Sequence, residues 1–314
     1  MYWLYFWLCG TIWGSSFMLI RVGVEATHPI HVAFVRLAVG ALFMLGTALL
    51  MRYSFPTDRK TWFSFALLGL TNNALPFALI SFAETSVESG LASVLNATTA
   101  LFGLVIAHFA FRDERMTPQK IVGVVMGFIG VIILGARNWQ GGELQTSSLV
   151  GQFAMLGASF CYAISTSYTR KVMQGAQLAP TMTAALIMLF GAFYTGMATL
   201  IGAGLGTLPL SAPLTMSPDA LLAILVLGFL NTYVAYLLYY QLVHGLGAAR
   251  TTMITYVVPP VALLLGVLFL GEQLDAYIIG GAALIFAGIG VVNMRLFRSI
   301  NQWFAKPAIN SAGD

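Results

Sequence analysis

The chain has 314 residues, of which 59% are hydrophobic and 8% are charged, with a formal net charge of +4 and a mean hydropathy of +0.85. Soluble domains carry about 25% charged residues, so this composition excludes an ordinary soluble domain. We therefore predict that the chain lies in a membrane and that the lipid bilayer is one of its partners.

Ten apolar segments are each long enough to cross a bilayer as a helix, since one span needs about 20 mostly apolar residues. The first has neither a preceding basic residue nor an A-x-A cleavage site, so we expect it to be retained rather than removed as a signal peptide. Cys9 and Cys161 both fall inside spans and are expected to be free thiols. In chain order the spans are predicted at roughly 3–24, 30–51, 62–83, 88–110, 118–136, 149–169, 178–201, 219–242, 248–270 and 276–294.

The distribution of basic residues predicts the orientation of these spans. With the N-terminus in the cytoplasm, twelve of the fifteen Lys and Arg residues fall in inner loops or in the C-terminal tail. The outer loops then hold only Arg21 and Arg137, and Arg36 lies within the second span. This bias follows the positive-inside rule and predicts that both termini are cytoplasmic.

The second half of the chain repeats the first in sequence. WGSSFMLIR at 13–21 matches YAISTSYTR at 162–170, and LLGLTNN at 67–73 matches VLGFLNT at 226–232. FRDERM at 111–116 likewise corresponds to LGEQLD at 270–275, but the second copy lacks arginine. The first copy is predicted to lie in the cytoplasm and the second outside, which explains the difference.

Because each repeat contains five spans, the second must enter the membrane from the opposite side to the first. The predicted fold is an all-α membrane protein of ten transmembrane helices in two inverted five-helix repeats. Such repeats are typical of secondary transporters, whose sites lie at the midplane between the halves. The predicted units are 1–140 for the first repeat, 146–298 for the second and 299–314 for a cytoplasmic tail.

These features resemble a known family. Two five-helix units, the early WGSSF, the arginine in the second span, and the LGEQL motif followed by IIGGAALIFAGIG are similar to EamA-type transporters of the drug/metabolite transporter superfamily. The resemblance covers nearly the whole chain. Within the family, the length and the layout of spans are most similar to bacterial exporters of amino acids, including aromatic ones. The resemblance implies a multi-pass protein of the bacterial inner membrane.

Polar and aromatic residues near the middle of the predicted spans are the candidates for substrate binding. Ser, Thr and Asn in a membrane can also simply cross-link helices. Asn72 and Asn231 occupy equivalent depths in the two repeats, as do Trp13 and Tyr162, which favours a functional role. The candidates are Trp13, Ser16, Asn72, Asn96, Tyr162, Ser165, Asn231, Tyr233, Tyr236, Tyr256 and Arg36.

Charged residues near the spans leave two questions open. Arg36 is predicted either to bind a substrate carboxylate or to snorkel outward as a structural residue. Glu84 and Glu88 flank a short outer turn, where we expect solvated loop carboxylates. No Asp, Glu or His lies at a predicted midplane, so we expect transport without ion coupling unless Glu84 or Glu88 enters the cavity in one state.

The function predicted from the sequence is export of small metabolites, with amino acids favoured, by alternating access. The alternatives are a broad drug or nucleoside exporter and, outside transport, a membrane-embedded lipid enzyme or scaffold. His108 and Asp113 have the H-x4-D spacing of acyltransferases but straddle a helix end and a loop, so no catalytic residue is predicted. We expect no cofactor, no metal and no nucleic-acid partner, and a monomer or weak homodimer.

Overall fold

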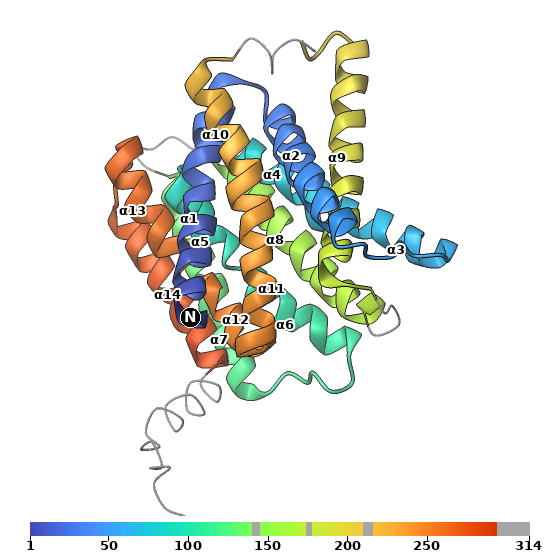
Figure 1. The fold of residues 1–314 in the computed structure, drawn as a ribbon. Helices are drawn as coiled ribbons and strands as arrows, with labels where there is room; N and C mark the ends of the chain where they lie inside the picture. Colours follow the sequence, from blue (N-terminus) through green and yellow to red (C-terminus); the bar gives the residue numbers. More distant parts are fainter. Residues whose placement is uncertain (140–144, 174–177, 210–215, 294–314) are drawn as a thin grey trace, which may run out of the picture.

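The computed structural model describes residues 1–139, 145–173, 178–209 and 216–293, and within these ranges it contains helices and no strands. The helices run mostly side by side in a bundle (Figure 1). The tail expected at 299–314 lies outside the described residues.

The helix bounds follow the predicted spans closely. In the first half they are α1 (Tyr2–Ala26), α2 (Pro29–Leu50), α3 (Arg59–Leu68), η1 (Gly69–Ala74), α4 (Leu75–Ala83), α5 (Ser89–Asn96), α6 (Thr99–Ala110) and α7 (Pro118–Ala136). In the second half they are α8 (Thr146–Met173), α9 (Pro180–Gly204), α10 (Pro218–Gly228), η3 (Phe229–Val234), α11 (Ala235–Leu246), α12 (Ala248–Thr251), η4 (Thr252–Tyr256), α13 (Val258–Leu270) and α14 (Ala276–Val292).

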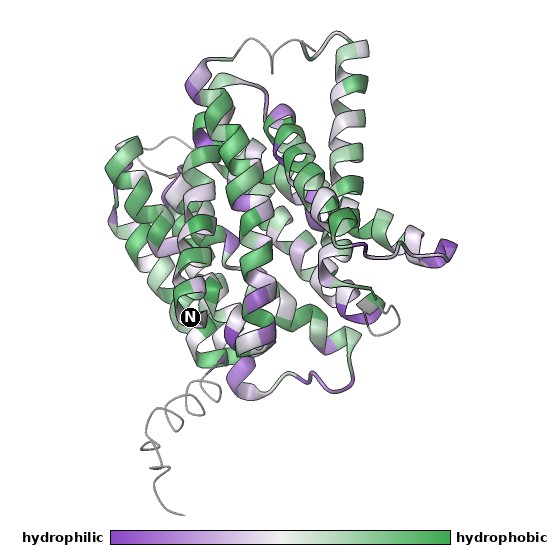
Figure 2. Ribbon diagram, in the orientation of Figure 1, coloured by the Kyte–Doolittle hydropathy of each residue, from purple (hydrophilic) through white to green (hydrophobic). Residues whose placement is uncertain are grey.

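Within the described residues, nine helical stretches are long and apolar enough to cross a membrane, and α14 is a shorter apolar helix. Large apolar side chains are exposed around the bundle, among them Leu42, Phe109 and Phe153. Figure 2 shows hydrophobic residues along most helices and hydrophilic ones in the α6–α7 loop and at the start of α3. An apolar exterior of this kind is stable in lipid, so the chain is a multi-pass membrane protein.

Two of the spans contain a π-helical segment. In the Arg59–Ala83 span, η1 separates α3 from α4 and ends two residues before Pro76, whose missing N–H removes one helical hydrogen bond. In the Pro218–Leu246 span, η3 separates α10 from α11, and the Thr232 hydroxyl donates to the Leu227 carbonyl at 3.0 Å. Asn72 lies in η1 and Asn231 lies in η3, so each asparagine sits in a π-helical turn, which is wider than an α-helical one.

Two further spans are interrupted in other ways. The α5–α6 span breaks after Asn96, where the Thr98 hydroxyl donates to the Leu95 carbonyl at 2.6 Å. The 3₁₀-helix η4 precedes α13, whose first turn contains Pro259. Broken spans of this type expose backbone groups and are typical of transporter binding sites.

Two pairs of helices pack closely within the bundle. α2 packs against α9, and α7 packs against α14. A Cβ added at Gly123 of α7 would lie 2.5 Å from the Gly288 carbonyl oxygen of α14, so the two backbones touch at glycine. The Gly123-x-x-x-Gly127 motif therefore packs helices within the bundle.

Candidate functional site

Four aromatic rings and one arginine gather between helices of the two halves of the chain. Trp13 of α1 meets Tyr236 of α11 edge to face, with ring centroids 6.0 Å apart. Phe77 of α4 meets Tyr162 of α8 in the same manner, at 6.5 Å. Arg36 of α2 lies among them, so we call these five residues the central cluster.

The Arg36 guanidinium is held on several sides. Its Nε donates to the Thr232 hydroxyl of η3 at 3.0 Å, and its central carbon lies 3.9 Å from the centroid of the Phe77 ring. Tyr162 and Tyr236 interact with it electrostatically. Arg36 is only 7% exposed and points into the bundle, so it does not snorkel outward. A cation fixed in this way can bind a carboxylate with its remaining N–H groups.

Two asparagines sit beside the cluster in the π-helical segments. The Asn72 side-chain oxygen accepts a hydrogen bond from the Ser165 hydroxyl at 3.1 Å, which connects η1 to α8. The Asn231 amide donates to the Ile12 carbonyl and, at 2.9 Å, to the Ser15 hydroxyl, which connects η3 to α1. Both asparagines therefore link helices from different halves of the chain.

The remaining candidates lie at different places. Ser16 and Asn96 are buried or half-buried, and each has a buried side-chain oxygen without a hydrogen-bond partner in the described residues. Tyr233 does not join the central cluster: its hydroxyl bonds to Thr47 at 2.8 Å and its ring packs against Phe43.

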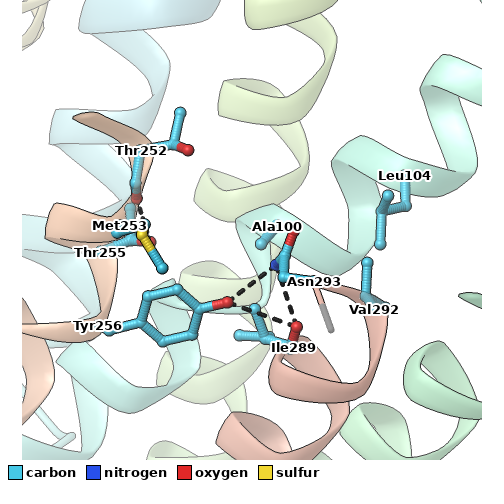
Figure 3. Close-up of a pocket in the computed structure, with 9 residues that line it drawn as sticks. All are labelled: Ala100, Leu104, Thr252, Met253, Thr255, Tyr256, Ile289, Val292 and Asn293. Carbon is cyan, nitrogen blue, oxygen red and sulfur yellow. Dashed lines mark hydrogen bonds between the residues drawn. The ribbon is translucent and has the colours of Figure 1, made fainter. Parts of the chain in front are cut away.

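Tyr256 lines a separate small cavity of about 170 Å³ between α6, η4 and α14. Its hydroxyl accepts a hydrogen bond from the Asn293 amide at 2.8 Å, as Figure 3 shows. Leu104 and Val292 form part of the apolar wall. The sequence did not predict this polar pair, because Asn293 lies at the very end of the last span.

A network of charged groups joins the two halves at the end of the bundle predicted to be outside. The Glu272 carboxylate, after α13, accepts hydrogen bonds from the backbone N–H groups of Ser89 and Gly90 at 2.6 and 2.9 Å. Arg137 binds Glu88 at 2.9 Å and Asp275 at 2.5 Å. Burial disfavours the charge of Arg137, but the hydrogen bonds to both carboxylates raise its pKa.

A second network lies at the opposite end. Arg170, at the end of α8, binds Asp113 at 2.8 Å and Glu114 at 3.5 Å in the α6–α7 loop. The bond from Arg170 lowers the pKa of Asp113. This network is more open to solvent, with side-chain exposures of 41% for Arg170 and 65% for Asp113. Arg170 and Asp113 correspond in the sequence repeat to Arg21 and Glu272 of the outer end.

Glu84 corrects one expectation drawn from the sequence. We expected a solvated loop carboxylate, but its side chain is 0% exposed, and neither carboxyl oxygen has a hydrogen-bond partner in the described part of the chain. Glu84 directly follows α4, and Arg21 donates to its backbone carbonyl at 2.7 Å, so the residue is held against α1. Glu88 remains half-buried and paired with Arg137.

Comparison with known proteins gives the family. Residues 1–136 and 149–294 each match the EamA-like transporter family. The chain belongs to this family. It is 30% identical over 267 residues to the uncharacterized inner membrane transporter YedA of Escherichia coli (strain K12), covering 84% of this chain and 81% of the relative.

Other relatives are similar over most of their length. The chain is 28% identical over 295 residues to a probable amino-acid metabolite efflux pump of Salmonella typhimurium (strain LT2), covering 91% of this chain and 92% of the relative. It is 28% identical over 263 residues to the uncharacterized transporter YdfC of Bacillus subtilis (strain 168), covering 83% and 80% respectively. A crystal structure with 16% sequence identity shares the fold, with a TM-score of 0.65 over 94% of this chain and 97% of the other. This EamA-like protein is therefore a membrane transporter of small molecules.

Three residues of the site were missed by sequence reasoning. Phe77 and Thr232 hold Arg36, and Glu272 binds the start of α5. Phe77 follows the Pro76 that breaks its span, and Thr232 follows Asn231. The neighbours of a helix break are therefore the signal that could have found the first two.

Proposed function

We propose that this EamA-like transporter exports amino acids from the cytoplasm by alternating access, with the central cluster as the substrate site. The position of Arg36 carries the proposal. It is a buried cation with aromatic rings around it, placed between the two halves of the chain. Arg36 would bind the substrate carboxylate, while Trp13, Phe77 and the two tyrosines would contact an apolar or aromatic side chain.

The inverted-repeat arrangement is part of the same proposal. Two separate matches to the family, at 1–136 and 149–294, support a duplicated unit. The π-helical segments η1 and η3 fall at equivalent points of the two units, which also supports it. We infer ten spans with both termini in the cytoplasm of a bacterial cell, in its inner membrane. The relative described as a probable amino-acid metabolite efflux pump supports amino acids as the substrate class.

A counterflow assay in proteoliposomes tests the substrate class. The panel contains phenylalanine, leucine, phenylalaninamide, phenethylamine, a nucleoside and a cationic drug. We expect exchange of the two amino acids and weak or no exchange of the amide and the amine, because these lack the carboxylate that Arg36 would bind. Preferred exchange of the drug or the nucleoside would contradict the proposal and favour a broad exporter instead.

Variants of Arg36 test the site itself. We expect Arg36→Gln to reduce amino-acid exchange at least tenfold, since a hydrogen bond to a charged group contributes about 1.5–3 kcal/mol. Arg36→Lys keeps the charge but loses the forked geometry, so it should retain part of the activity. Arg59→Gln is the matched control, because Arg59 is exposed at the start of α3. Equal activity of Arg36→Gln and the wild type would contradict the assignment.

A further inference from the structure

Glu84 is a buried acid that the proposed substrate site does not use. Both of its carboxyl oxygens are inaccessible to solvent and lack hydrogen-bond partners within the described residues. Placing an ionised carboxylate in such an environment is strongly unfavourable unless a counter-ion compensates. Neither Arg21 nor Arg36 forms an ion pair with it among the described residues, so the arrangement favours the neutral acid.

The charged groups around Glu84 come from several elements. Arg21 of α1 and Arg36 of α2 are near enough to interact electrostatically, as is Glu272 from the α13–α14 connection. The segment α5, which follows in the chain, has no charged residue, and the charges of α8 lie at its other end, at Arg170 and Lys171. Burial raises the pKa of Glu84 well above its usual range, and Glu272 adds to this, while the two arginines oppose it.

A polar pocket of about 450 Å³ at the outer end connects this region to solvent. Its wall includes Arg21, Glu25, Glu88 and Glu272, and Glu25 is more than half exposed. Arg21 and Glu272 also flank Glu84, so the acid lies next to the pocket wall. A small movement of this wall would hydrate Glu84 and bring its carboxyl group to Arg21, whose guanidinium already bonds to the Glu84 carbonyl.

We propose that Glu84 is a proton-binding site of the outer gate: it takes up a proton from the outer solution when this end closes, and must release it before this end opens. The outer gate is the contact of Glu272 with the Ser89 and Gly90 N–H groups. An ionised Glu84 would repel the Glu272 carboxylate that binds there, and the neutral acid does not. The proposal rests on the alternating access proposed above.

The direction of the pH effect follows from the two states. The closed state holds Glu84 buried and binds the proton more tightly than the open, hydrated state, so lowering the outer pH favours closure. Raising the pH from the usual carboxyl range toward the raised pKa of the closed state favours opening. Because the proton enters and leaves on the outer side, this gate requires no net proton transport.

A buried cysteine at the gate can report opening. Ser89 is 0% exposed beneath Glu272, and Ser89→Cys is nearly isosteric. In a background with Cys9→Ala and Cys161→Ala, a membrane-impermeant maleimide is applied from outside between pH 5.5 and 8.5, with Glu84 or with Glu84→Gln. The gate cysteine is the same in both proteins, so the ratio of labelling rates reports opening and not thiol chemistry.

We expect the two proteins to label at equal rates at low pH. At high pH we expect the protein with Glu84 to label about tenfold faster than Glu84→Gln at the same pH. Glu84→Gln mimics the protonated acid, so its labelling rate should rise with pH only as the thiol itself ionises. Glu25→Gln is the matched control, because Glu25 is an exposed carboxylate of the same pocket, and it should keep the wild-type pH response.

Three results would overturn the proposal: equal labelling with Glu84 and Glu84→Gln at every pH, loss of the response in Glu25→Gln, or a pH midpoint in Glu84→Asp identical to that with Glu84. Glu84→Asp keeps a titratable group, so it tests the proposal even if Glu84→Gln does not fold. The labelling needs no substrate, so its failure is distinct from a failure of the amino-acid counterflow assay.

Discussion

At the level of single residues, the central cluster rests on how Arg36 is held. Thr232 and Phe77 fix its orientation, and Tyr162 and Tyr236 surround it. The depth of a residue in its span, together with matching positions in the two halves, was sufficient to predict Trp13, Tyr162 and Tyr236 as substrate-binding candidates from the sequence. Tyr233 has a similar depth and lies three positions before Tyr236, a spacing that predicts a shared helix face. It faces Thr47 instead, because it lies in the π-helical segment η3, whose wider turn differs from that of an α-helix.

Hydroxyl deletions in two tyrosines of the same span test this distinction. Tyr236→Phe removes a hydroxyl near Arg36, and we expect it to weaken amino-acid binding by about threefold to tenfold, the effect of one hydrogen bond. Tyr233→Phe removes a hydroxyl that bonds to Thr47 and should leave binding unchanged. Binding is measured by the substrate concentration that gives half-maximal counterflow. A larger effect for Tyr233→Phe than for Tyr236→Phe would place the substrate site beside Thr47 and Phe43 instead of at the central cluster.

At the level of elements, the sequence predicted where the spans lie but not where they break. Hydrophobic stretches of sufficient length define a span whatever its interior geometry, so the segments agree closely with the helices. The π-helical segment η3 contains no proline and depends on the Thr232 hydroxyl and on neighbouring helices. The burial of Glu84 likewise depends on α1 and on the α13–α14 connection, which are distant in sequence.

The contact between α7 and α14 gives a test at this level. Gly288→Ala would place a methyl group against the Gly123 carbonyl and the α7 backbone, and we expect a loss of about 1–3 kcal/mol in stability from overpacking. Gly290→Ala, two residues further along the same helix, meets nothing within 4 Å and should not lower stability, because Ala favours a helix over Gly. Thermal unfolding in detergent compares the two. Equal midpoints would show that this contact does not limit stability.

At the level of the whole molecule, charged networks join the halves at both ends. The outer network binds the start of α5 and the end of α7, while the inner one joins the end of α8 to the α6–α7 loop. Alternating access requires these connections to break in turn, which surface ion pairs of modest strength permit. The basic residues predicted the sidedness of the ends, whereas the pairing partners required the fold.

The sequence places no Asp, Glu or His at a predicted midplane, and this gives a prediction about energy. We expect counterflow at equal internal and external pH, and no accumulation of a net-neutral amino acid under an imposed pH gradient. Such a gradient should change only the rate, through Glu84. The measurement is radiolabelled uptake into proteoliposomes. Accumulation that follows the gradient in the wild-type protein would contradict this expectation and would mean that a proton crosses the membrane with or against the substrate.

Accessibility of the central site from both sides of the membrane tests the account most directly. Ser16 is buried one helical turn from Trp13, so Ser16→Cys, in a background with Cys9→Ala and Cys161→Ala, places a small reporter beside the central cluster. We expect an impermeant thiol reagent to label it from the outer side and, in inverted vesicles, from the inner side, and saturating phenylalanine to slow both reactions. Labelling from one side only, or labelling that no amino acid slows, would contradict a substrate site that opens alternately to the two sides.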